Sequence, residues 1–205
     1  MKKILQAIGA MLMNVGENPE VPESATNQIL QDPARAGREF LKFLRNGARV
    51  VIGEIKKIFI DRSQKFDIKK FQSGDWKIDE EDERSLKLNE IDLTKIEFAN
   101  MLKDGETSIV GEEKLRRLKK DGRIRLDAKI FQTLWEDQSL IPESWKVKIN
   151  GEIRFIYFDG TILRFSDGDR YVLYLYWDDG QWYWDYRWLD HVFRAHRSSA
   201  VLASN

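Results

Sequence analysis

The chain has 205 residues, of which 42% are hydrophobic and 33% are charged, a composition that suits one compact domain or two small ones. Lysine plus arginine and aspartate plus glutamate both number 34, so the net charge is zero and indicates neither nucleic acid nor an anionic membrane as a partner. The absence of cysteine excludes disulfides, thiolate metal ligands and cysteine nucleophiles, and is compatible with a cytoplasmic location.

The first segment, 1–62, is predicted to contain helices and a strand. The apolar residues of 4–15 recur at helical spacing, which favours a packed helix over a secretion signal or a membrane-surface helix, and the run is too short to span a bilayer. A second helix is expected over 32–47, because Asp-Pro suits a helix start and Asn-Gly suits a helix end. The β-branched residues of 48–60 favour a strand, although their spacing also fits a helix.

The middle segment, 63–144, is predicted to begin irregularly. The acidic run 79–83 is interpreted as a solvated loop or the start of a helix, and it lies in a stretch (75–83) with six acidic residues and one basic residue. Residues 86–102 alternate in a way that fits short strands, but part of this stretch fits a helix equally well.

A helix pair is then predicted at 111–121 and 128–138. The first helix has acidic residues in its first turn, basic residues in its last turn and Gly122 as its end. The second helix begins after Asp127, whose side chain suits an N-cap. The residues I-R-L between the two helices indicate a short strand.

Residues 145–205 are predicted to form an aromatic antiparallel β-meander followed by a tail. Fourteen of the 39 residues from 155 to 193 are Phe, Tyr or Trp, and they include every tyrosine. Asp-Gly pairs at 159–160, 167–168 and 179–180 each predict a hairpin, since type I′ turns need a positive φ at both central positions. The fold class is therefore predicted as α+β, with a helical N-terminal portion and a C-terminal antiparallel β-meander.

Large aromatic residues occupy both faces of the predicted meander. Either both faces are covered by other parts of the chain, or one face is a recognition surface for a glycan or a protein. Arg154, Arg164, Arg170 and Arg187 would add charge or cation–π contacts. The candidate ligand-binding residues are Tyr174, Tyr176, Trp182, Tyr183, Trp184 and Tyr186.

The first helix of the pair offers an alternative binding surface. Seven basic and three acidic residues lie between 112 and 125. A basic edge of this kind is either a solvated helix face or a contact for nucleic acid phosphates. The candidate nucleic-acid-binding residues are Arg116, Arg117, Lys119, Lys120, Arg123 and Arg125.

The sequence carries no recognisable enzyme motif. His191 and His196, five positions apart, are interpreted as a surface or tail pair rather than as metal ligands, and Asp178 and Asp179 are assigned to a turn. Without a nucleophile elbow, a P-loop or a dinucleotide-binding fingerprint, no catalytic residue, metal site or cofactor is predicted. The expected function is a non-enzymatic binding or protein-interaction module that uses the aromatic sheet, with a nucleic-acid-associated protein as the alternative.

Two strings of the sequence resemble a family of small bacterial proteins from candidate-phylum genomes. They are I-R-L-D-A-K-I-F-Q-T-L-W-E-D-Q-S-L-I-P-E-S-W-K at 124–146 and G-D-R-Y-V-L-Y-L-Y-W at 168–177. The resemblance extends over about residues 25–204 and implies a bacterial protein of a single family. It implies no activity, ligand or catalytic residue.

Overall fold

The computed structural model describes residues 57–203, which fall within one compact unit, Ile52–Asn205. The helices predicted at 4–15 and 32–47, and most of the strand predicted at 48–60, lie outside the described residues. The described part of that last stretch contains strand β1, Lys57–Phe59, as expected. Within residues 57–203, no helix has the length and apolar character needed to cross a membrane.

The described residues form an α+β fold with two α-helices. Helices α4 (Gly111–Asp121) and α5 (Ala128–Glu136) lie in the middle of the chain, whereas the predicted fold placed the helical portion at the N-terminus. The other strands are β2 (Lys77–Glu81), β3 (Glu90–Asp92), β4 (Ile96–Ala99), β5 (Ser108–Val110), β6 (Ile124–Arg125), β7 (Lys148–Ile149), β8 (Glu152–Ile153), β9 (Phe155–Tyr157), β10 (Thr161–Arg164), β11 (Arg170–Asp178), β12 (Gln181–Trp188), β13 (Val192–Arg194) and β14 (Arg197–Leu202). Short 3-10 helices lie at Ile68–Lys70, Ser85–Lys87, Leu93–Lys95, Gln138–Leu140 and Glu143–Trp145.

The helix pair forms where local sequence signals predicted it. Gly122 adopts a φ of 84° just after α4 and ends that helix, because a residue with a side chain is disfavoured in this conformation. The carboxylate of Asp127 accepts hydrogen bonds from the backbone N–H groups of Lys129 and Ile130 and caps α5. Helix α5 ends at Glu136, two residues before the predicted end, because Asp137 instead caps the following 3-10 turn.

Most strands belong to one eight-stranded sheet. Its order is β2-β10-β11-β9-β14-β4, with β12 paired to β11 and β6 paired to β14. All pairs are antiparallel except β14 with β9, which are parallel, so the sheet is mixed and not the simple meander that was predicted. Strands from the predicted middle and C-terminal segments therefore share one sheet. Three two-stranded sheets complete the strand pairing: β1 with β3, β5 with β13, and β7 with β8.

Two of the three Asp-Gly pairs lie in hairpins. Asp179 and Gly180 have φ values of 47° and 80° and join β11 to β12, as a type I′ turn requires. The pair at 167–168 lies in the loop between β10 and β11.

The third pair, Asp159-Gly160, does not reverse the chain, so this hairpin prediction is wrong. Tyr157 lies opposite Tyr174, and Leu163 lies opposite Tyr171, so β9 and β10 follow one another along the same strand β11. A local turn interrupts the line between them, and the Gly160 N–H donates to the backbone carbonyl of Leu126 in the β6–α5 connection. Neither Asp159 nor Gly160 has the positive φ of a type I′ turn.

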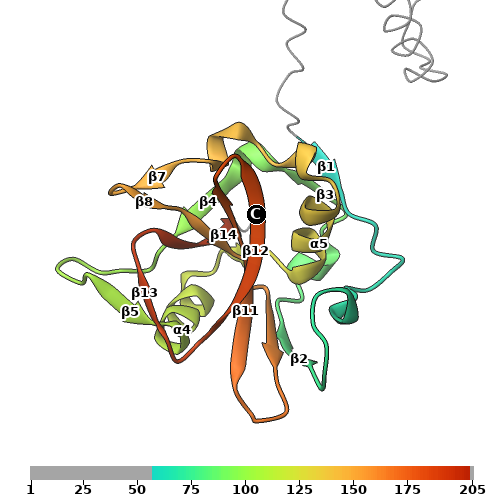
Figure 1. The fold of residues 1–205 in the computed structure, drawn as a ribbon, viewed down its shortest axis with the longest axis horizontal. Helices are drawn as coiled ribbons and strands as arrows, with labels where there is room; N and C mark the ends of the chain where they lie inside the picture. The colour runs from blue at the N-terminus through green and yellow to red at the C-terminus, as the bar shows by residue number, and fades with distance from the viewer. Residues whose placement is uncertain (1–56, 204–205) are drawn as a thin grey trace, which may run out of the picture. The chain divides into compact units, whose positions relative to one another are not determined.

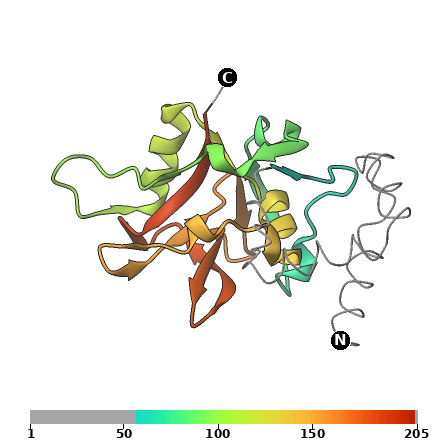
Figure 2. The same ribbon diagram turned by 90° about the horizontal axis from the view of Figure 1, so that it is seen from above.

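The hydrophobic core lies on both sides of the long strands. The larger cluster lies between the sheet and α5, and a second cluster includes Leu115 of α4 together with Val172 and Tyr174 of β11. Figure 1 shows β11 and β12 between the two helices, and Figure 2 shows α4 and α5 well separated in a second view. Both faces of the central strands are therefore covered over much of their length.

One lysine lies wholly inside this core. The ammonium of Lys114 on α4 donates to the Ser199 hydroxyl at 2.5 Å and faces the Asp159 carboxylate at 3.4 Å, and neither charged side chain is exposed by more than 1%. The rings of Tyr157 and Phe193 each lie 4.8 Å from the lysine Nζ. Burial lowers the pKa of Lys114, while the nearby Asp159 acts in the opposite direction.

Candidate functional site

The β11–β12 pair presents two faces of different character. Tyr176 lies opposite Tyr183, and Leu175 lies opposite Trp184, so cross-strand neighbours share a face. We call the side that packs on α5 the α5 face and the other side the α4 face. The candidate residues divide between them: Trp182, Trp184 and Tyr186 lie on the α5 face, and Tyr174, Tyr176 and Tyr183 lie on the α4 face.

The α5 face is mostly hydrophobic core. Trp182 is 5% exposed, and Trp184 packs edge-on against Phe71 and Phe131 at centroid distances of 5.1 and 6.1 Å. Tyr186, at 37% exposure, is the most accessible of the three and contacts the ring of Trp76. Packing of the fold accounts for the two tryptophans.

The α4 face is buried near its middle and opens toward the β11–β12 turn. Tyr174 is 7% exposed, and its hydroxyl donates to the Asp185 carboxylate at 3.2 Å; burial, with Asp185 close by, raises the pKa of Tyr174. Tyr176 and Tyr183 are half-buried and stack with centroids 5.3 Å apart and planes 20° apart. The ring of Phe155 lies 5.1 Å from that of Tyr176. We call Phe155, Tyr176 and Tyr183 the tyrosine platform.

A polar cavity of about 310 Å³ adjoins this platform. Phe155 connects the two, because the Arg197 guanidinium lies 4.7 Å from its ring centre and the His196 ring lies 5.6 Å away. We call this cavity the arginine pocket. It is lined by Glu152, Arg187, Val192, Arg194, His196 and Arg197.

The arginines of this pocket differ from most others in the protein. Eight of the twelve arginines in residues 57–203 form ion pairs with described carboxylates. Among these described residues, Arg154, Arg187, Arg194 and Arg197 form none, and three of the four line the arginine pocket. Positive charge therefore exceeds negative charge there, since Glu152 is the one carboxylate in the described lining.

Two of these guanidiniums are held by neutral partners. Arg187 donates to the Val192 carbonyl at 3.0 Å, and Arg197 donates to the Tyr157 hydroxyl at 3.1 Å. The Nε of Arg187 is buried and has no hydrogen-bond partner among the described residues. Burial, reinforced by the neighbouring Arg197, lowers the pKa of Arg187.

His196 lies at the wall of the pocket, and its assignment to a surface or tail pair is wrong. It is only 5% exposed because its backbone carbonyl accepts from Phe155 N–H, which draws the β13–β14 connection against the sheet. Its Nδ1 contacts the Glu152 carboxylate. Burial lowers the pKa of His196, and Arg197 acts in the same direction, whereas the Glu152 carboxylate acts against both. The net lowering favours the neutral imidazole near pH 7. His191, by contrast, is exposed and packs on Trp188.

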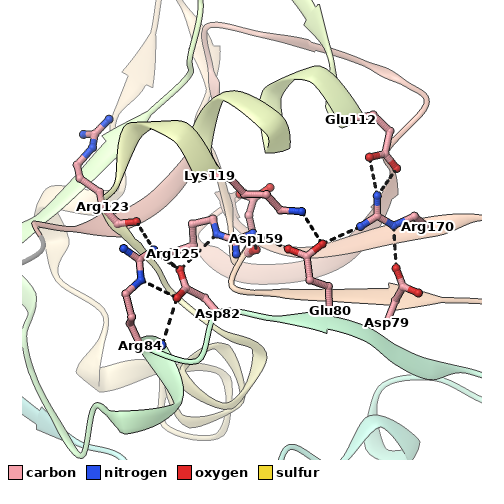
Figure 3. Close-up of polar contacts among 10 residues, drawn as sticks. All are labelled: Asp79, Glu80, Asp82, Arg84, Glu112, Lys119, Arg123, Arg125, Asp159 and Arg170. Carbon is pink, nitrogen blue, oxygen red and sulfur yellow. Dashed lines mark hydrogen bonds and ion pairs between the residues drawn. The ribbon is translucent and has the colours of Figure 1, made fainter.

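Most of the acidic run 79–83 lies in strand β2, which ends at Glu81, so its prediction as a loop or helix start is wrong for these residues. Asp79 pairs with Arg164 and Arg170 at 2.7 and 2.9 Å. Glu80 pairs with Lys119, Arg125 and Arg170, and Asp82 pairs with Arg84 and Arg125. Apart from Arg164, which is not drawn, Figure 3 shows these side chains as an almost continuous ion-pair network between β2, α4 and β11. Long-range partners stabilise this acidic segment as a strand.

Most of the basic candidate residues on α4 and just after it also form ion pairs. Lys119 and Arg125 bind the network, and Arg123 pairs with Glu97 at 2.7 Å. Arg116 and Arg117 both pair with Glu113, and Arg117 also pairs with Glu106. For Lys120, no ion pair with a described residue is present. An open groove of about 660 Å³ follows this helix, lined in part by Arg116, Arg117, Lys120 and Arg123.

No family model, curated protein or solved structure matches this chain. What the platform and the pocket can bind is therefore inferred from their own geometry. Among the described residues, no group of three histidine or carboxylate side chains is placed to hold a metal ion.

The sequence predicted part of this site. Tyr176 and Tyr183 were among the candidate residues and Arg187 was among the arginines expected near the sheet, but the candidates were drawn from both faces of the sheet. Arg194, His196 and Arg197 were missed, although the stretch H-V-F-R-A-H-R at 191–197 contains four basic or imidazole side chains and no acid. That local excess was the available signal.

Proposed function

We propose that the protein is a cytoplasmic, non-enzymatic binding module whose ligand site is the tyrosine platform with the adjoining arginine pocket. The observation that carries this proposal is the continuity between a half-exposed aromatic stack and a pocket whose guanidiniums form no ion pair with residues 57–203. The proposed partner is a glycan or a protein segment. The resemblance to a bacterial family adds no activity and no ligand to this proposal.

The platform has the physical properties of a recognition surface. Tyrosine rings present flat apolar area with few rotatable bonds, so little conformational entropy is lost when they bind. Tyr176 is held between Phe155 and Tyr183, with Tyr174 at 5.9 Å, and these contacts fix its ring before any ligand arrives. Preorganisation of this kind increases affinity.

Binding should depend on the α4 face and not on the α5 face. We expect Tyr176→Ser and Tyr183→Ser each to weaken binding to a glycan or peptide by about tenfold, as loss of a central aromatic contact typically does. Tyr186→Ser is the matched control, because it removes an exposed tyrosine from the opposite face. The measurement is retention of the full chain on immobilised glycan and peptide panels. A panel without any retained ligand, or an equal loss with Tyr186→Ser, would argue against the proposal.

Nucleic acid binding through α4 is the alternative, and the groove beside Arg116, Arg117, Lys120 and Arg123 supports it. The intramolecular ion pairs of three of these residues oppose it, because their charge is already compensated. Retention on DNA or RNA that weakens steeply with salt and disappears in Arg116→Glu/Arg117→Glu would favour this alternative. Retention that changes neither with salt nor with the double substitution would exclude nucleic acid binding through α4.

A further inference from the structure

We propose that the arginine pocket binds the phosphoryl group of a phosphate monoester, an inference that rests on the proposed binding function and specifies its ligand. Three guanidiniums without described carboxylate partners line one cavity, Arg187, Arg194 and Arg197. Arginine combines a permanent charge with a planar array of N–H donors that matches phosphate oxygens. The pocket therefore has the charge and the donors that an oxyanion needs.

Most donors of the pocket remain available. Arg187 and Arg197 each make one hydrogen bond within the described residues, to a carbonyl and to a hydroxyl, which leaves several N–H groups on each side chain. The buried Arg187 Nε has no partner among residues 57–203. A buried donor without a partner costs free energy, but this nitrogen has almost no exposed surface, so the donors that a ligand can reach are the terminal N–H groups of the guanidiniums.

The carboxylate in the described lining of the pocket, Glu152, offsets only part of the charge of its three arginines. Glu152 is bound to His196, and Asp185 accepts from the Tyr174 hydroxyl; neither forms an ion pair with Arg187, Arg194 or Arg197. His196 is neutral near pH 7 and adds no charge. The lining thus keeps a net positive charge.

A phosphoryl group suits this charge better than a carboxylate does. A phosphate monoester carries a charge of about −1.5 to −2 at pH 7 and three terminal oxygens. A carboxylate carries a single charge and is matched by one guanidinium fork. Three arginines that line one cavity therefore favour the phosphoryl group.

The tyrosine platform should hold the organic part of the ester. Phe155 contacts both Arg197 and Tyr176, so a group attached to a phosphoryl in the pocket would lie along the aromatic surface. An aromatic ester gains stacking contacts there that inorganic phosphate cannot make. Aryl phosphates should consequently bind more tightly than inorganic phosphate.

The test is a titration of the isotope-labelled full chain with phenyl phosphate and with inorganic phosphate, followed by amide and arginine side-chain NMR shifts at constant ionic strength. We expect saturable shifts around the pocket, with tighter binding of phenyl phosphate. Arg187→Gln, Arg194→Gln and Arg197→Gln should each raise the Kd by about tenfold or more, as expected for loss of a charge-assisted hydrogen bond. Arg194 is exposed, so its variant is expected to fold even where the other two do not.

Arg116→Gln is the matched control, since it removes the same charge from the exposed face of α4. It should change the Kd by less than about twofold. Absence of saturable phenyl phosphate binding, or an equal weakening by Arg116→Gln, would overturn the inference. If glycans or peptides bind through Tyr176 while phenyl phosphate does not, only the phosphoryl inference fails. If phenyl phosphate binds and is not weakened by Tyr176→Ser, the platform proposal fails instead.

Discussion

Replacing Lys114 with methionine is expected to lower the free energy of unfolding by about 3–5 kcal/mol, the usual result of removing one partner of a buried ion pair. The substitution keeps the volume of the side chain but leaves the buried Asp159 carboxylate without its cation. Ser199 also loses the hydrogen bond that it accepts from the lysine. The loss should appear directly in urea denaturation followed by circular dichroism.

Two companion variants separate this effect from ordinary packing. Lys114→Met/Asp159→Asn removes both charges, so we expect it to recover much of the stability that the single substitution loses. Lys119→Met lies on the same helix but breaks a half-exposed pair with Glu80, and should cost less than about 1 kcal/mol. A loss for Lys114→Met no larger than that for Lys119→Met would show that the pair contributes little.

Replacing Gly160 with alanine is expected to destabilise the fold by at least about 3 kcal/mol. A Cβ at this position would lie 2.2 Å from the Arg125 carbonyl oxygen and 2.6 Å from the Leu126 backbone. These atoms are main chain, and Gly160 N–H donates to the Leu126 carbonyl at 2.8 Å, so they cannot move aside without breaking the junction between β10 and the β6–α5 connection.

Gly180→Ala provides the matched control for this substitution. Gly180 has a φ of 80°, and a methyl group added there would meet no atom within 4 Å, so only the left-handed conformation opposes alanine. That conformation costs roughly 1–2 kcal/mol for a residue with a side chain. Thermal and urea unfolding of both variants measures the difference. A Gly160→Ala variant as stable as Gly180→Ala would contradict the close approach.

The elements that sequence predicted well are those stabilised by neighbours in the chain. Helix α5 follows from its Asp127 cap, and the β11–β12 hairpin follows from strand alternation around Asp179-Gly180. Strand β2 could not be predicted this way, because its acidic side chains pair with Arg164 and Arg170, more than 80 positions later. Isolated from these arginines, the run has the composition of a solvated loop.

The candidate site likewise has a part that local sequence signals indicate and a part that depends on long-range strand pairing. Tyr176 and Tyr183 were both predicted as candidates, whereas their position on one face follows from the register of the β11–β12 hairpin. The positions of Arg194 and Arg197 depend on β13 and β14 turning back, with β14 running parallel to β9. No local pattern specifies a parallel pairing between strands that are separated by several others in the chain. The arginine pocket could therefore not be predicted from the sequence.

The central claim is that one ligand occupies the tyrosine platform and the arginine pocket together. The most direct measurement is a set of intermolecular nuclear Overhauser effects between phenyl phosphate and the full chain. We predict contacts from the phenyl ring to Phe155 and Tyr176, with the largest side-chain shifts at Arg187 and Arg197. Contacts to Tyr186 and Trp184 on the α5 face, or to α4, would contradict the claim.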